Sequence, residues 1–105
     1  MGCNGKQTSE ETSSDSTHTR KYIVQIHTKQ PNLALRILDT METRKEMESY
    51  NADYIRMAIY HNVLSQRRLS RFHCLRAVNN PDFKKKNKED YCDALRMLAE
   101  LDYKE

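Results

Sequence analysis

The sequence predicts a small, mainly α-helical domain of three or four short helices. The chain has 105 residues but only 2 Gly and 2 Pro, and an all-β sandwich or barrel needs many more of these residues for its turns. Beyond residue 30, apolar side chains recur at intervals of three and four residues. That spacing is typical of helices with one buried stripe.

Residues 1–19 differ in composition from the rest of the chain. Eight of them are Ser or Thr and three are acidic, and beyond Met1 and Cys3 none is apolar. Such a segment cannot bury enough apolar surface to offset the entropy lost on ordering. We therefore expect a disordered tail over 1–19 and a helical domain over 20–105.

Residues 22–26 show a different pattern, in which Tyr22, Val24 and Ile26 alternate with the side chains between them. A period of two with β-branched residues predicts a short strand. No second strand-like run follows in the chain. Either another chain supplies the pairing strand, or tertiary contacts make this segment helical or extended.

Residues 31–46 fit one helix. Pro31 suits the first helical position, because the N–H that it lacks would be unpaired there anyway. Apolar residues then follow at helical intervals, at Ala34, Ile37, Leu38 and Met41. The polar run over 42–46 is expected to continue this helix in contact with solvent.

A second helix is predicted over 51–64, with Asn51 as its N-cap. One side carries Ile55, Ala58, Ile59 and Val63, and further apolar residues flank them. This apolar surface is wider than one core-facing stripe requires. We therefore expect this helix to be the central one.

The apolar pattern changes phase between Leu64 and Leu69, which predicts a break near Ser65, the expected cap of a third helix. The helix would bury a stripe of Leu69, Phe72, Leu75 and Val78. It would end before Pro81, because the residue before a proline avoids the helical conformation. One bent helix over 51–78 is the alternative.

The last predicted helix follows a lysine-rich connector over 84–88. Asn87 is a suitable N-cap, and the acidic Glu89 and Asp90 in the first turn complement the helix dipole. The apolar stripe of this helix is Tyr91, Leu95, Leu98 and Leu101.

Three cysteines, Cys3, Cys74 and Cys92, form an odd set without close pairs, and the chain starts without an apolar secretory segment. This pattern favours reduced thiols in the cytoplasm or nucleus. A zinc site would have to use the same thiols with the four histidines, but no pair has CxxC or HxxxH spacing. We therefore expect no metal at His18, His27, His61, His73, Cys74 or Cys92.

The start of the chain, Met-Gly-Cys, indicates a modification site. Removal of Met1 would expose Gly2 for myristoylation, and Cys3 could then be palmitoylated, which together anchor a protein stably to a membrane. Lys6 stands where the myristoylation motif prefers Ser or Thr. The alternative is an ordinary start without modification.

Charge is distributed unevenly along the C-terminal half. Residues 67–88 contain eight basic residues and one acid, whereas residues 89–105 contain six acids and two basic residues. A basic helix followed by a lysine run can bind phosphates or an acidic partner. The residues for this role are Arg67, Arg68, Arg71, Lys84, Lys85 and Lys86. The alternative is a solvated basic face that the acidic last helix neutralises.

Ser70 follows two arginines in the run Arg67-Arg68-Leu69-Ser70, which suits a basophilic kinase. Phosphorylation would insert about −1.5 to −2 charges into the basic segment. A serine inside a helix is poorly accessible to a kinase, so the alternative is a chance match.

The sequence gives little support for catalysis. Both glycines lie near the start of the chain, so there is no glycine-rich phosphate loop, and no serine lies in a nucleophile elbow. His61 and His73 are twelve residues apart, and Cys74 and Cys92 have no base at a fixed spacing. We therefore expect a non-enzymatic protein without a cofactor.

The favoured functional hypothesis is a small cytoplasmic adaptor or regulator that binds a partner protein, or a second copy of itself, through a helical face. The chain has 6 Tyr and 5 Met, which are enriched at protein interfaces, although they can equally fill a small core. We predict this face at Ile55, Ile59, Leu95 and Leu98. The basic segment would steer an acidic partner or a membrane surface to it. The alternative is a nucleic-acid-binding regulator that uses residues 67–88.

Overall fold

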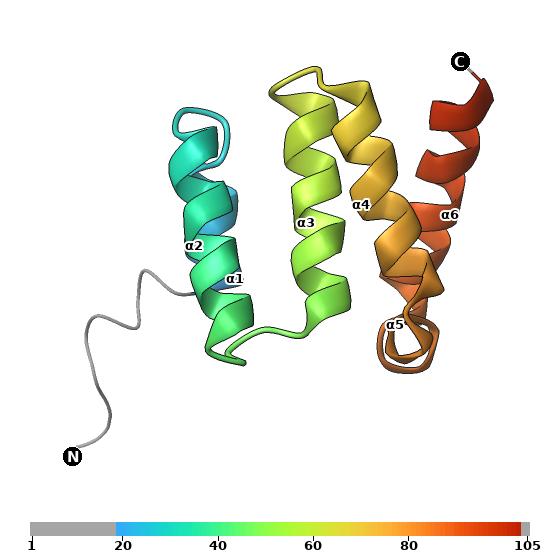
Figure 1. Ribbon diagram of the computed structural model, residues 1–105, viewed down its shortest axis with the longest axis horizontal. Coiled ribbons are helices and arrows are strands. Elements are labelled where there is room, and N and C mark those ends of the chain that lie inside the picture. Colours follow the sequence, from blue (N-terminus) through green and yellow to red (C-terminus); the bar gives the residue numbers. More distant parts are fainter. Residues whose placement is uncertain (1–18, 104–105) are drawn as a thin grey trace.

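The computed structural model describes residues 19–103 and is helical throughout, with no strand in this range (Figure 1). The helices are α1 (Arg20–Ile26), α2 (Pro31–Thr43), α3 (Ser49–Asn62), α4 (Arg67–Asn79), α5 (Pro81–Lys86) and α6 (Lys88–Tyr103). The predicted helical class is therefore confirmed. The described part contains more helices than the predicted three or four, because α1 and α5 are short helices that the sequence pattern did not reveal. The predicted tail lies outside the described residues, apart from Thr19.

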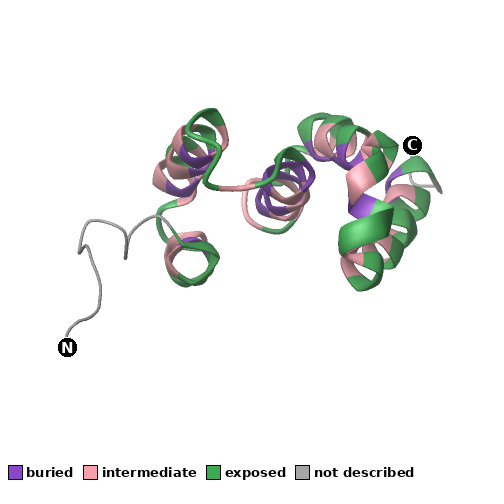
Figure 2. Ribbon diagram, turned by 90° about the horizontal axis from the view of Figure 1, so that it is seen from below, coloured by how far each residue is buried: buried purple, intermediate pink, exposed green. Residues whose placement is uncertain are grey.

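The helices form an elongated array that measures 53 × 31 × 20 Å. α2, α3, α4 and α6 follow one another along the longest dimension, with α1 against α2 and α5 at the end of α4 (Figure 1). α3 packs against both α2 and α4, so it is the central helix, as predicted. Buried residues lie mainly where helices face one another, and the outer sides are exposed (Figure 2). The arrangement leaves each long helix with a solvent-facing side.

α1 corrects the predicted strand over 22–26. Thr19 is its N-cap, and the Thr19 hydroxyl accepts a hydrogen bond from the backbone N–H of Tyr22 at 3.1 Å. Ile23 is fully buried and Ile26 packs against the same core cluster, whereas Val24 is exposed. The two isoleucines are three residues apart, so a helix brings both to α2. The alternating pattern concealed this pair.

The first core cluster joins α1, α2 and α3. α2 begins at Pro31, as predicted, and contributes Ala34, Leu38 and Met41 to the buried set. The helix ends at Thr43, before the polar run is complete, and Lys45 has a left-handed backbone with φ of 60°. The expected continuation of the helix to residue 46 is therefore wrong.

Two predicted helix starts also need correction. α3 begins at Ser49 with Glu48 as its N-cap, so Asn51 lies inside the helix rather than at its cap. The predicted break between α3 and α4 is present, but Ser65 lies in the turn with φ of 53° and Gln66 is the N-cap of α4. Such a left-handed residue cannot continue a right-handed helix, which separates α3 from α4.

The second core cluster joins α3, α4, α5 and α6. Its centre is Phe83 in α5, which stacks on Tyr50 at a ring-centroid distance of 4.9 Å. Lys84, Lys85 and Lys86 form the last turn of this helix, so the predicted connector is itself helical. The cap of the last helix is confirmed, because Asn87 Oδ1 accepts a hydrogen bond from the backbone N–H of Asp90.

Among residues 19–103, no helix combines the length and the apolar character that crossing a lipid bilayer requires.

Candidate functional site

The predicted partner-binding residues divide between the interior and the surface. Ile59 is fully buried and Ile55 is 7% exposed, because α1 and α2 cover this side of α3. They are core residues of this fold, which corrects their prediction as a docking face. In α6, Leu98 is half-buried against the second core cluster, and Leu95 is exposed.

Three of the six predicted phosphate-binding residues have partners within the domain. Arg67 donates a hydrogen bond to the carbonyl of Leu101, and Arg71 forms an ion pair with Asp102. These contacts attach α4 to the end of α6, as the alternative of a neutralised basic face requires. Lys86 contacts Glu48 at 2.6 Å, and this hydrogen bond raises the pKa of Lys86.

The other three basic residues do not form one patch. Arg68 lies in the first turn of α4, whereas Lys84 and Lys85 lie in α5, beyond the opposite end of α4 (Figure 1). All three are exposed. The structure therefore separates the basic residues into two regions about one helix length apart, or roughly 20 Å for a helix of this length.

Ser70 is fully buried, and its hydroxyl donates a hydrogen bond to the carbonyl of Met57 at 3.0 Å. This contact joins α4 to α3. A kinase could reach Ser70 only after α4 had separated from α3.

The predicted lipidation residues and the possible metal ligands lie partly outside the described range. Gly2, Cys3 and His18 lie outside the described residues. In the described range, no three His, Cys, Asp or Glu side chains are grouped to hold a metal ion. Cys92 is exposed and Cys74 is buried. Burial raises the pKa of the Cys74 thiol from its ordinary 9.0 to about 11.

We expect the two described cysteines to react very differently. In a full chain carrying Cys3→Ser, Cys92 should react rapidly with Ellman's reagent at neutral pH, and Cys74 only after unfolding in guanidinium. Between pH 9 and 11 the unfolded thiol loses its proton before the folded one, so the free energy of unfolding should fall with rising pH. Rapid reaction of two thiols in the folded chain would contradict this burial.

The structure shows a buried ionic network that the sequence analysis missed. Asp53 of α3 is 2% exposed and accepts contacts from Arg56 at 3.1 Å and His73 at 2.9 Å. Arg76 Nε lies 3.4 Å from its second carboxylate oxygen. The sequence pattern did not indicate an ion-pairing role for His73. The one sequence signal for this network was the three-residue spacing of Asp53 and Arg56, which suits a pair on one helix face.

Arg56 extends the network to α2. It contacts Asp39 and Glu42, each at 2.7 Å. Burial alone would lower the pKa of Arg56, but the hydrogen bonds to Glu42 and Asp39 outweigh it and the pKa is raised. The network therefore links three consecutive helices and fixes α4 against α3.

The outward side of α4 lies beside this network. We name Arg68, Leu69, Phe72 and Arg76 the α4 outer face. At 3.6 residues per turn these four lie within an arc of about 100°, opposite the buried Ser70, Cys74 and Ala77. Phe72 is 51% exposed and Leu69 is 40% exposed. The prediction that Leu69 and Phe72 belong to the buried stripe of this helix is therefore wrong. Both point to solvent, and small residues face the core instead.

Two neighbouring side chains contact the Phe72 ring on this face. Its ring makes an edge contact with His73 at a centroid distance of 5.1 Å, and the Arg76 guanidinium lies 5.7 Å from the Phe72 centroid. His73 and Arg76 are themselves held by Asp53. The buried network therefore orients an exposed aromatic ring.

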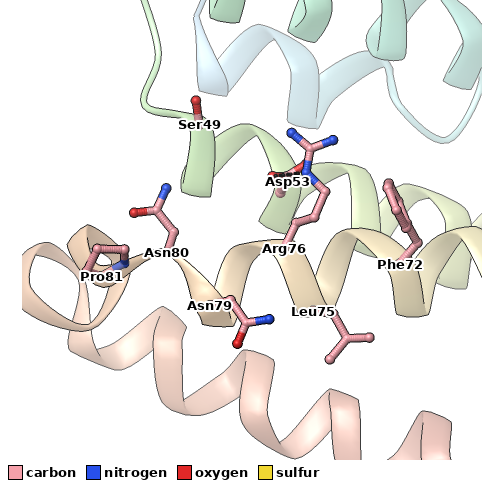
Figure 3. Close-up of a pocket in the computed structure, with 8 residues that line it drawn as sticks. All are labelled: Ser49, Asp53, Phe72, Leu75, Arg76, Asn79, Asn80 and Pro81. Atoms are coloured by element: carbon pink, nitrogen blue, oxygen red, sulfur yellow. Dashed lines mark ion pairs between the residues drawn. The ribbon is translucent and has the colours of Figure 1, made fainter.

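An open groove adjoins the α4 outer face where α3, α4 and α5 meet (Figure 3). It has a volume of about 620 Å³, within the range of pockets that bind ligands. Phe72, Leu75 and Pro81 contribute its apolar walls, and Asn79 and Asn80 contribute polar atoms. Figure 3 shows Arg76 extending from α4 toward Asp53 on α3.

Comparison with protein-family models, with curated protein sequences and with solved structures gives no match to this chain.

Proposed function

We propose that the chain is a non-enzymatic adaptor or regulator that binds a partner protein on the α4 outer face and the adjoining groove. The observation that supports this most strongly is the exposure of Leu69 and Phe72, one turn apart on one helix. Of the four large apolar side chains that are exposed among residues 19–102, they are the two that share a helix. Contiguous exposed apolar surface with a polar rim is characteristic of protein interaction sites.

The rigidity of the face supports the same proposal. An aromatic side chain that is already in its bound position loses little conformational entropy on binding. Phe72 has this property because His73 and Arg76 contact its ring and both are attached to the buried Asp53. A fixed aromatic residue beside a groove is the arrangement expected of a binding hot spot.

The basic residues also favour a protein partner over the nucleic-acid alternative. Arg67, Arg71 and Lys86 already contact a carbonyl or a carboxylate of the domain. Phosphate binding along a nucleic acid relies on several free cations that follow the backbone. The α4 outer face instead presents two cations around two apolar side chains.

A photo-reactive phenylalanine analogue at position 72 tests this proposal in the native host. We expect it to form a covalent adduct with a partner protein, and the same analogue at the exposed Val24 of α1 to form none. The partner identified in this way is then purified. Phe72→Ala should weaken its binding by at least about tenfold, as hot-spot truncations do, whereas Val24→Ala should leave the affinity unchanged. Equal adducts at the two positions, or equal affinities of the two variants, would refute the assignment of α4.

A further inference from the structure

We infer that the partner segment docked on the α4 outer face is an acidic peptide whose carboxylates flank one aromatic or large aliphatic side chain. This inference rests on the proposed function and names its partner class. Three features support it: the charge of α4, the spacing of its exposed arginines, and the groove that Phe72 and Arg76 help to line.

The charge of α4 is uniformly positive. Residues 67–79 contain four arginines and no acid. Arg67 and Arg71 point toward the end of α6, where they contact Leu101 and Asp102, so both already have partners within the domain. Arg68 and Arg76 remain on the outer face. A surface with this charge selects acidic partners and repels basic ones.

The neighbouring acids already contact basic residues of the domain. Asp39 and Glu42, which line a cavity together with Arg76, both contact Arg56. Asp53 is buried and shared by Arg56, His73 and Arg76. Glu48, before the start of α3, contacts Lys86. Arg76 turns its Nε toward Asp53, but its side chain is half-exposed, and a guanidinium carries five N–H donors. It can therefore hold Asp53 and a partner carboxylate at once.

The spacing of the two arginines defines the partner pattern. Arg68 and Arg76 each lie four residues from Phe72, so all three lie on one side of α4. Eight residues of helix separate the arginines by about 12 Å. An extended peptide covers this distance in about four residues. The five-residue segment that fits therefore has an apolar residue at its centre and an acidic residue at each end.

The apolar residue of this pattern has a site beside Phe72. The groove of about 620 Å³ has apolar walls at Phe72, Leu75 and Pro81. An aromatic side chain seated there can stack on the exposed Phe72 ring or meet it edge to face. Lys84 and Lys85 of α5 are exposed and add positive charge beyond the groove.

Selection from a library of random short peptides on the immobilised full chain tests the partner class. We expect the selected peptides to share a central Phe, Trp or Leu with Asp or Glu two residues to either side. Binding of a labelled selected peptide, measured by fluorescence anisotropy, should weaken at least about tenfold with Arg68→Glu, and it should weaken with added salt. Arg36→Glu, at an exposed arginine of α2, is the matched control and should bind normally.

The outcomes separate this inference from the proposed function. The acidic partner class would be overturned by selected peptides that need Phe72 but contain no acids. It would also be overturned by peptides that bind the Arg68→Glu variant normally. Either result would leave the docking face in place. Peptides that bind the Phe72→Ala variant normally would overturn both. The inference would also be overturned if no peptide were selected. The same holds if a single-stranded DNA with the same net charge as the selected peptide displaced it completely.

Discussion

Asp53→Ala is expected to lower the free energy of unfolding by about 3–5 kcal/mol, because it removes one side of a buried ionic network. Asp53 is 2% exposed and contacts Arg56, His73 and Arg76. Without this carboxylate, the 6% exposed Arg56 keeps only partners on α2. Urea unfolding followed by circular dichroism measures the loss.

Asp39→Ala is the matched control for this experiment. Asp39 contacts the same guanidinium at 2.7 Å, but its side chain is 69% exposed. Ion pairs with an exposed member contribute at most about 1 kcal/mol, so this variant should remain close to the original stability. If the two variants were equally stable, the network would not hold α3 against α4 in the way described.

Phe83→Ala is expected to cost a similar amount, about 3–5 kcal/mol, through the cavity that it leaves. Phe83 is fully buried and contacts Tyr50, Tyr54 and Tyr91, which come from α3 and α6. The residue therefore joins α5 to both neighbouring helices. Thermal and urea unfolding of the purified variant measure the change.

The same substitution at Phe72 supplies the comparison. Phe72 is 51% exposed on α4, and substitutions at exposed positions usually change stability by no more than about 0.5 kcal/mol. Phe72→Ala should therefore fold normally while losing its partner, whereas Phe83→Ala should lose stability. A Phe72→Ala chain as unstable as Phe83→Ala would mean that Phe72 is a packing residue and would remove the main support for the docking face.

The sequence predicted the helices whose signals are local. Pro31 begins α2, and the three- and four-residue spacing of Ala34, Leu38 and Met41 matches their burial. Asn87 precedes α6 with its side chain in the capping position. In these cases the chemistry of one residue or the period of one stripe determines the structure without help from distant segments.

The two short helices escaped prediction for physical reasons. α1 has 7 residues and α5 has 6, fewer than two turns each, so neither displays a full apolar stripe. A helix of this length is not stable alone and forms because of its tertiary contacts. In α5 the contact is made by Phe83, one aromatic residue before three lysines. Its burial depends on two tyrosines of α3 that lie far earlier in the chain, Tyr50 and Tyr54.

The candidate site was predicted only in outline, as a helical protein-binding face. Ile55 and Ile59 are as apolar as interface residues, and the sequence does not say that α1 and α2 cover them. In α4, the large residues Leu69 and Phe72 were expected inside. Ser70, Cys74 and Ala77 are buried instead, because small side chains let α4 approach α3 and α6 closely. Periodicity finds the stripe of large residues, but it does not show which side of a helix its neighbours occupy.

The measurement that tests the central claim most directly is an NMR titration of the ¹⁵N-labelled full chain with the partner segment identified through position 72. The account predicts that the largest chemical-shift changes fall on Arg68, Leu69, Phe72 and Arg76 and on the groove residues beside them. The amides of α1 and α2 should remain unchanged. Shift changes centred on Val24 or on Leu95, the other exposed large apolar residues, would contradict the account and place the binding surface on α1 or α6.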